Sequence, residues 1–210
     1  MQKINFNYDT IERFGSYWVQ IHEALQIQPK TLLEVGPGRY MFHDYLQRHG
    51  VEVTLLDIEP PELPGAIGTV TELPFQNNAF DVSVAFEVLE HIPFEDFRTA
   101  LAELGRVARS RVIISIPDCR YYFRVLVNAP SIAHRKSHAF QLQFMVSFPR
   151  IFHRKVPPAA PGGHIWEMGR SGYPLGKVIA QTPSNLRLIN HYRLWNNPFH
   201  HTFVFEKQPE

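Results

Sequence analysis

Short segments made almost wholly of apolar residues alternate with amphipathic segments, and this alternation constrains the fold most. Strands that a parallel sheet buries on both faces have such continuous apolar runs. The predicted strands of this kind are residues 31–35, 51–57, 66–70, 80–86 and 111–116. Strand–helix alternation with buried strands is typical of an α/β fold built on an open, mostly parallel sheet.

Apolar residues at spacings of three and four predict the intervening helices. The first helix is expected to begin at Asp9, with Glu12 completing an acidic analogue of a capping box. Its apolar stripe consists of Ile11, Phe14, Trp18, Ile21 and Leu25. Two more helices are predicted before Gly50 and from 94 to 108, and a short one after Pro174. Residues 186–195 and 201–205 are predicted to close the fold as an antiparallel hairpin.

A chain of 210 residues is expected to form one domain, 1–210, with its own core. Cys119 is the only cysteine, which excludes an internal disulfide framework and a multi-cysteine zinc site. We see no apolar stretch behind a basic leader at the N-terminus, and no run of about 18 apolar residues that would span a membrane. These features favour a cytoplasmic protein.

The net charge of +1 conceals a strong asymmetry along the chain. Residues 1–118 contain 9 Lys and Arg against 17 Asp and Glu, whereas residues 119–166 contain 7 Lys and Arg and no acid. This basic segment is either a solvated face or a surface for an anionic ligand or a membrane. Nucleic acid is not expected as a partner, because the acidic body would repel a long polyanion.

Aromatic residues are interleaved with the basic ones in the same segment. Phe140, Phe144 and Phe148 fall four apart and predict one face of a helix that Pro149 ends. The accompanying cations are Arg124, Arg135, Lys136, Arg150, Arg154 and Lys155. Such a stripe either packs on the sheet or serves a lipid-linked or phosphorylated ligand or a membrane interface.

Gly36-Pro37-Gly38 follows the first predicted strand and precedes a helix, an arrangement that lets the backbone approach a ligand closely. Asp57 ends the next strand, where a carboxylate can accept the hydroxyls of a ribose or merely cap a turn. Together they indicate a nucleoside-containing cofactor. A nicotinamide-dependent reductase would share these two features, but no hydride-transfer constellation accompanies them.

A longer series of motifs, in a fixed order along the chain, distinguishes between these kinds of nucleoside cofactor. It comprises Glu34-Val35-Gly36-Pro37-Gly38, Asp57, Leu73-Pro74-Phe75, Phe80-Asp81 and Val88-Leu89-Glu90-His91-Ile92. Over about residues 30–117 it resembles the class I S-adenosylmethionine-dependent methyltransferases, in particular the methyltransferase type 11 (ubiquinone/menaquinone-biosynthesis-like) group. The resemblance implies a Rossmann-like, seven-stranded sheet with helices on both faces. It also implies S-adenosyl-L-methionine as cofactor, with methyl transfer to oxygen or carbon of a small, sugar- or lipid-linked acceptor.

On that resemblance the chain divides into an N-terminal helix (1–29), a cofactor-binding core (30–117), an acceptor-side cap (118–170) and a last helix with the hairpin (171–210). The residues expected around the methionine part of the cofactor are Glu34, Gly36, Pro37 and Gly38. Those expected at its ribose, adenine and sulfonium are Asp57, Ile58, Thr69, Val70, Phe86 and Glu87. Tyr40 replaces the usual third glycine and is expected to crowd the carboxyl end of the cofactor. Thr69 replaces a common aspartate and removes one contact to adenine.

Histidines are the natural candidates for a base if the acceptor is a hydroxyl. We consider His164 with Glu167, and His91, as catalytic candidates, each with a structural role as its alternative; the pair His200 and His201 is a further candidate. No metal site is predicted, because His164 and Glu167 lack a third ligand. The other hypothesis is a non-catalytic module that binds a membrane or a partner through 119–166.

Overall fold

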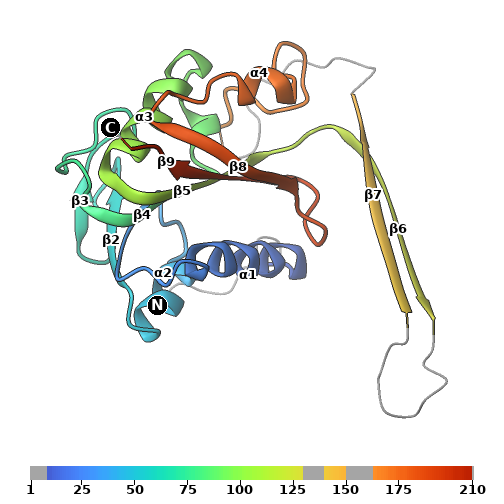
Figure 1. Cartoon of the computed structure of the whole chain (residues 1–210), viewed down its shortest axis with the longest axis horizontal. Helices are drawn as coiled ribbons and strands as arrows, with labels where there is room; N and C mark the ends of the chain where they lie inside the picture. Colours follow the sequence, from blue (N-terminus) through green and yellow to red (C-terminus); the bar gives the residue numbers. More distant parts are fainter. Residues whose placement is uncertain (1–8, 130–139, 150–162, 210) are drawn as a thin grey trace.

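The computed structural model describes residues 9–129, 140–149 and 163–209 (Figure 1). Its centre is a seven-stranded sheet. In spatial order the strands are β3 (Gly65–Ile67), β2 (Glu52–Asp57), β1 (Thr31–Val35), β4 (Phe80–Phe86), β5 (Ala108–Pro117), β9 (His200–Lys207) and β8 (Leu186–Arg193). The first five are parallel, whereas β9 runs antiparallel to β5 and β8 antiparallel to β9. The predicted mostly parallel sheet and its closing hairpin are confirmed.

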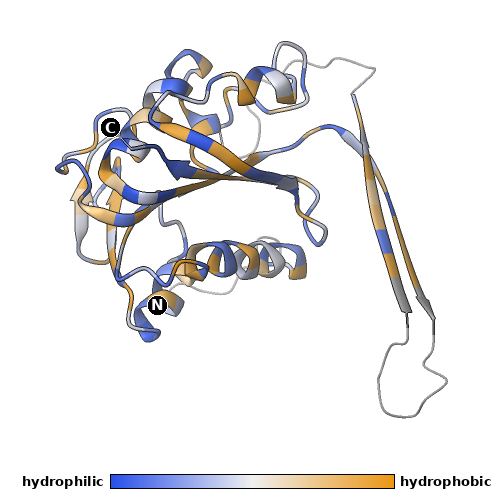
Figure 2. Ribbon diagram, in the orientation of Figure 1, coloured by the Kyte–Doolittle hydropathy of each residue, from blue (hydrophilic) through white to orange (hydrophobic). Residues whose placement is uncertain are grey.

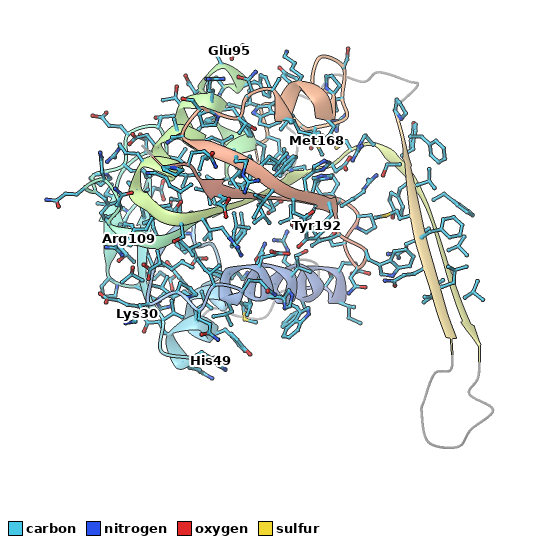
Figure 3. All side chains as sticks on the ribbon, viewed as in Figure 1. Lys30, His49, Glu95, Arg109, Met168 and Tyr192 are labelled. Atoms are coloured by element: carbon cyan, nitrogen blue, oxygen red, sulfur yellow. The ribbon has the colours of Figure 1, made fainter. Side chains whose placement is uncertain are left out.

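Helices cover both faces of this sheet, as predicted (Figure 1). On one face, α1 (Ile11–Leu25) and α2 (Met41–Arg48) pack their buried side chains against Leu32, Val84 and Ile113. On the other, α3 (Phe97–Val107) and α4 (Leu175–Ile179) share a core with Leu33 and Ile114. Neighbouring residues of one strand thus enter different cores, because successive side chains point to opposite faces. Tyr192 on β8, labelled in Figure 3, also donates a hydrogen bond to Glu23 on α1.

The start of α1 differs from the prediction in two ways. Thr10, not Asp9, is the N-cap, and its hydroxyl accepts a hydrogen bond from the Arg13 amide at 3.3 Å. The apolar stripe does not face the core along its whole length, since Ile11 and Trp18 are 85% and 61% exposed. The helix instead buries Ser16, Gln20, Ile21 and Ala24. Only its C-terminal half reaches the apolar core. The prediction from periodicity was therefore wrong about which face of the helix turns inward.

Residues 121–148 correct a second prediction. β6 (Tyr121–Ala129) and β7 (Phe140–Phe148) pair antiparallel and project from the body as a two-stranded ribbon (Figure 1). Phe140, Phe144 and Phe148 therefore lie on a strand and not on a helix. A spacing of four residues places side chains on one face of either element, so the spacing could not distinguish them. Arg135, Lys136, Arg150, Arg154 and Lys155 lie outside the described residues.

The remaining connections are short. Two single-turn 3-10 helices, η1 (Leu89–His91) and η2 (Phe94–Asp96), join β4 to α3. Residues 58–64, between β2 and β3, form a loop without a helix, and the three prolines there disfavour one. No helix in the described part of the chain has the length and apolar character needed to cross a membrane.

Candidate functional site

Gly36 and Gly38 shape the turn between β1 and α2. Both have positive φ values, +68° and +54°, which glycine adopts without steric cost. A Cβ on Gly36 would lie 2.6 Å from Cγ2 of Val88, whereas a Cβ on Gly38 would meet nothing within 4 Å. Gly36 is therefore required for the backbone to pass Val88, and Gly38 leaves room beside the turn for another molecule.

Tyr40 occupies the third position of this turn without blocking it. It adopts the left-handed conformation, with φ 59°, that a glycine would take there, and it is the N-cap of α2. Its hydroxyl accepts a hydrogen bond from the amide of Glu62 at 2.8 Å, which holds the ring against the β2–β3 loop. Tyr40 lines neither of the two cavities described next, so the expected crowding does not arise in this conformation.

The larger cavity, of about 380 Å³, opens where β1, β2 and β4 end. Ligands of open α/β sheets bind at this edge, beyond the carboxyl ends of the strands. The predicted cofactor residues that line it are Gly36, Gly38, Asp57, Ile58, Thr69, Val70 and Glu87. His91, one of the catalytic candidates, also lines it. Residues spread over more than fifty positions of the sequence thus meet around one hollow.

A smaller cavity of about 50 Å³ adjoins the first through Gly36, Gly38 and Glu87, which line both. It brings in the remaining predicted cofactor residues, Glu34, Pro37 and Phe86. We did not predict that His200 or the α1 residues Arg13, Ser16, Tyr17 and Gln20 would line this cavity. The polar residues on one side of α1 were the sequence signal for this wall of the cavity, and the structure buries two of them, Ser16 and Gln20, to 1% and 5% exposure.

Three buried polar groups of the small cavity have an atom with no hydrogen-bond partner among the described residues: Oε2 of Glu34, Oε1 of Glu87 and Nδ1 of His200. Burial raises the pKa of Glu34 well above its usual value, and the nearby charge of Asp44 raises it further. Glu87 has a positive φ of 56°, a strained conformation for a residue with a side chain. Unsatisfied buried polar atoms and local strain are both typical of functional sites.

His200 faces Glu87 across the small cavity, with Nε2 3.5 Å from Oε2. Burial lowers the pKa of His200, although the carboxylate of Glu87 opposes this shift. The neighbouring His201 belongs elsewhere: its Nδ1 lies 3.1 Å from Oδ2 of Asp118. The pair therefore separates, with His200 at the candidate site and His201 in a buried charge cluster.

Asp118 is the centre of that cluster and is only 1% exposed. Arg120 donates to its carboxylate at 2.6 Å, and Arg193 lies 3.6 Å from it. Burial alone would raise the pKa of Asp118, but the hydrogen bonds from His201 and Arg120 and the two arginine charges lower it to about 2. The cluster fastens the base of the ribbon to the edge of the sheet.

The catalytic candidates His91, His164 and Glu167 lie near one another. The rings of His91 and His164 are 5.1 Å apart, and Nδ1 of His164 lies 2.9 Å from Oε1 of Glu167. Glu167 also accepts hydrogen bonds from Arg170 and, at 2.9 Å, from the thiol of Cys119. Burial raises the pKa of Glu167, but these hydrogen bonds outweigh it and lower the value to about 2. Unlike His91, which lines the larger cavity, His164 and Glu167 line neither of these two cavities.

A third cavity, of about 560 Å³, is rich in arginine. Arg120, Arg124, Arg170 and Arg193 line it, against the carboxylates of Glu12 and Asp118, so positive charge predominates. It adjoins the small cavity, because neighbouring residues line the two: Glu12 beside Arg13, and Phe199 beside His200. Asn197 of this cavity donates to Ser16 of the small one at 3.0 Å.

Comparisons of the sequence and the structure show which known proteins this chain is similar to. Residues 33–116 match the family model described as a methyltransferase domain. No curated protein matches the chain.

Solved structures share its fold at low sequence identity. A protein from Pyrococcus horikoshii OT3 superimposes with a TM-score of 0.61 at 12% identity, over 96% of this chain and 93% of that one. The 1,6-didemethyltoxoflavin-N1-methyltransferase of Burkholderia thailandensis gives 0.57 at 15% identity, over 97% and 81%. The N-methyltransferase NodS of Bradyrhizobium japonicum WM9, in complex with S-adenosylhomocysteine, gives 0.58 at 12% identity, over 96% and 90%.

Proposed function

We propose that this protein is a class I S-adenosylmethionine-dependent methyltransferase and transfers a methyl group to a small anionic acceptor, because residues 33–116 match the model of a methyltransferase domain. The observation that carries the proposal is the pair of adjoining cavities at the carboxyl edge of the sheet. All ten residues that the sequence predicted for cofactor binding line one or both of these cavities.

The two cavities differ as the two ends of the cofactor do. In the larger one, Asp57 is suited to accept the ribose hydroxyls, with Ile58, Thr69 and Val70 beside the adenine. In the smaller one, the unpartnered carboxylate of Glu34 is suited to an ammonium group, and Arg13 to a carboxylate. The orphaned acceptors of the small cavity fit the charged amino-acid end of S-adenosylmethionine. The cofactor supplies a methyl group already activated by its sulfonium, so the protein has mainly to align the acceptor.

The arginine-lined cavity supports an anionic acceptor. It lies next to the cavity proposed for the methionine end, separated from it by the Asn197–Ser16 hydrogen bond. Asp118 and Glu167 hold three of its four arginines, whereas Arg124 donates to the carbonyl of Trp195 at 2.6 Å and interacts electrostatically with Glu12. Among the described residues no carboxylate forms an ion pair with Arg124, so its guanidinium can pair with a phosphate or carboxylate of the acceptor.

The ribbon supports an acceptor that is linked to lipid. Cross-strand pairing places Phe123 opposite Val146 and Val127 opposite Leu142, so these four share one face, and all four are exposed. The opposite face is mixed: Arg124 and Tyr122 contact the body there, the latter beneath the guanidinium of Arg193. Figure 2 shows orange apolar stretches, interrupted by blue ones, along β6 and β7 outside the body. An exposed apolar face of this extent marks a surface that meets a membrane or another apolar partner.

Calorimetric titration with S-adenosylhomocysteine, with NADH as the competing nucleotide, tests the cofactor. We expect saturable binding of S-adenosylhomocysteine alone. Asp57→Ala should weaken it by at least about tenfold, since hydrogen bonds to a charged group are lost. Glu59→Ala is the matched control, because Glu59 is an exposed acid of the same loop that lines neither cavity. Binding of NADH instead, or equal affinity in both variants, would refute the assignment.

Flotation with phosphatidylcholine–phosphatidylglycerol vesicles tests the ribbon. Phe144→Ser, on the apolar face, should reduce vesicle binding, whereas Leu126→Ser, equally exposed on the opposite face, should not. Absence of vesicle binding by the wild type would contradict the lipid proposal, and a dimer that Phe144→Ser dissociates would assign the face to a second copy. The cytoplasmic location stays a prediction.

A further inference from the structure

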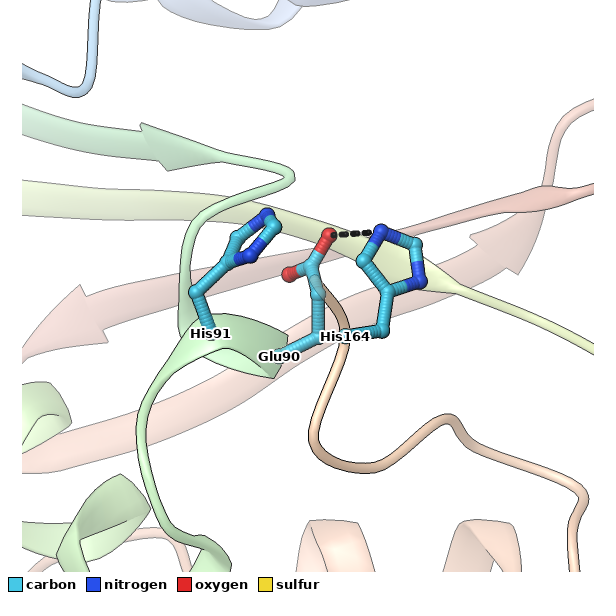
Figure 4. A group of neighbouring side chains, drawn as sticks. All are labelled: Glu90, His91 and His164. Atoms are coloured by element: carbon cyan, nitrogen blue, oxygen red, sulfur yellow. Dashed lines mark ion pairs between the residues drawn. The ribbon is translucent and has the colours of Figure 1, made fainter. Parts of the chain in front are cut away.

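Glu90, His91 and His164 form a group of metal-ligating side chains that the proposed function does not use. Glu90 and His91 belong to η1, and His164 comes from the segment that leads to α4. One donor atom of each residue lies within 4.8 Å of the other two. Figure 4 shows the Glu90 carboxylate between the two imidazoles. No metal site was predicted from His164 and Glu167, but folding brings Glu90 and His91 beside His164.

Glu90 is the first sign that something is missing from this group. Its side chain is fully buried, and neither carboxylate oxygen has a hydrogen-bond partner among the described residues. Glu87 and Glu167 lie near enough to disfavour another negative charge there. A buried carboxylate in this situation is costly unless a cation or a proton accompanies it.

The hydrogen bond of His164 gives a second, independent sign. Glu167 accepts hydrogen bonds from Arg170 and Cys119, and Nδ1 of His164 lies 2.9 Å from its Oε1. This contact turns Nε2 of the same ring toward Oε1 of Glu90, 3.8 Å away and beyond hydrogen-bond distance. The two atoms therefore face one another across a gap. A carboxylate behind a histidine, fixing its tautomer, is the usual outer partner of a metal-bound imidazole.

We propose that Glu90, His91 and His164 bind one divalent transition-metal ion. Two imidazoles and a carboxylate suit Zn²⁺ and Fe²⁺ and leave further coordination positions open. At metal–ligand distances of about 2.1 Å, tetrahedral donor atoms lie roughly 3.4 Å apart. At 3.8 Å the Glu90–His164 pair is close to this separation, and the widest pair, at no more than 4.8 Å, must contract by at most about 1.4 Å. The exposed His91 side chain is placed to make that movement.

The position of the group gives the ion a function. His91 also lines the larger cofactor cavity, so an ion held here stands at its wall. It would also tie the segment of His164 to η1, where the amide of Ile165 already donates to the carbonyl of Glu90 at 2.9 Å. The proposal concerns binding of the ion alone and does not depend on methyl transfer.

The test uses the full chain, stripped of metal and then equilibrated with Zn²⁺ and desalted. Elemental analysis should find one zinc per chain in the wild type, and none after His164→Ala. His49→Ala is the control, because His49 is an exposed histidine outside the group. Co²⁺ in place of Zn²⁺ should give d–d absorption bands that both His164→Ala and His91→Ala abolish.

A separate measurement distinguishes loss of the metal site from loss of folding in each variant. Circular dichroism reports whether each variant is folded, and the exposed His91 allows a variant without disturbance of the core. Addition of Zn²⁺ should raise the Tm of the wild type and leave that of His91→Ala unchanged. A wild type that retains no zinc, or variants that retain as much as the wild type, would overturn the proposal. Failure of S-adenosylhomocysteine binding would leave these readouts intact, so the two proposals can fail independently.

Discussion

Glu34→Gln separates cofactor binding from stability most clearly. The carboxylate is buried at the end of β1, lines the small cavity and has an unpartnered oxygen. If it receives the ammonium of the cofactor, the variant loses a charge-assisted hydrogen bond worth about 1.5–3 kcal/mol. That loss corresponds to a Kd for S-adenosylhomocysteine about 10- to 150-fold higher.

Stability should respond differently from affinity. Because burial raises the pKa of Glu34, the carboxyl group favours folding below its unfolded pKa of 4.5 and loses this contribution as pH rises through the folded value. A neutral amide carries no such penalty, so at pH 7 the variant should unfold at a temperature equal to or above that of the wild type.

Binding should also release a proton, since an ammonium favours the ionised carboxylate. Titrations in two buffers of different ionisation enthalpy measure this release directly. Glu52→Gln, an exposed acid on β2, is the control for all three measurements. A change in Kd of less than about threefold, with both proteins folded, would refute the role given to Glu34.

Three further predictions follow from the same geometry. Gly36→Ala should destabilise the protein by about 1–2 kcal/mol, because alanine is strained in the left-handed backbone conformation. The contact of the new Cβ with Val88 should add to this loss, which chemical denaturation measures. Asp118→Asn should lower the free energy of unfolding by about 3–5 kcal/mol, because buried arginines are left uncompensated. The wild type should lose about 2 kcal/mol of that free energy as pH falls from about 4 to 2, through the lowered pKa of Asp118. Stability that does not change over this pH range would contradict the lowered pKa. Arg124→Gln should raise the KM for an anionic acceptor at least several-fold. Arg48→Gln, on the exposed side of α2, should leave that KM unchanged, and equal effects of the two would dismiss the arginine-lined cavity.

Local chemistry explains why much of the fold was predictable. The strands 31–35 and 80–86 have the predicted bounds, because runs such as Leu32-Leu33 are too apolar to lie anywhere but inside a sheet. The glycine turn was equally plain, since the conformations of Gly36 and Gly38 follow from their lack of a side chain. Predictions that depended on spacing alone were weaker. Phe140, Phe144 and Phe148 fit a strand as well as a helix, and cross-strand pairing decided between them.

By itself, the sequence determined the order of the elements outside the ribbon, the parallel sheet, the glycine turn and the positions expected to meet the cofactor. These properties are local: each depends on backbone preference or on apolar runs a few residues long. Only the tertiary structure decided which distant side chains share a cavity. It brought Gln20 and His200 to Glu34, and Glu90 to His164, because such contacts arise from packing between elements far apart in the chain. The same packing determines which buried carboxylates remain without a partner, and these define the candidate sites.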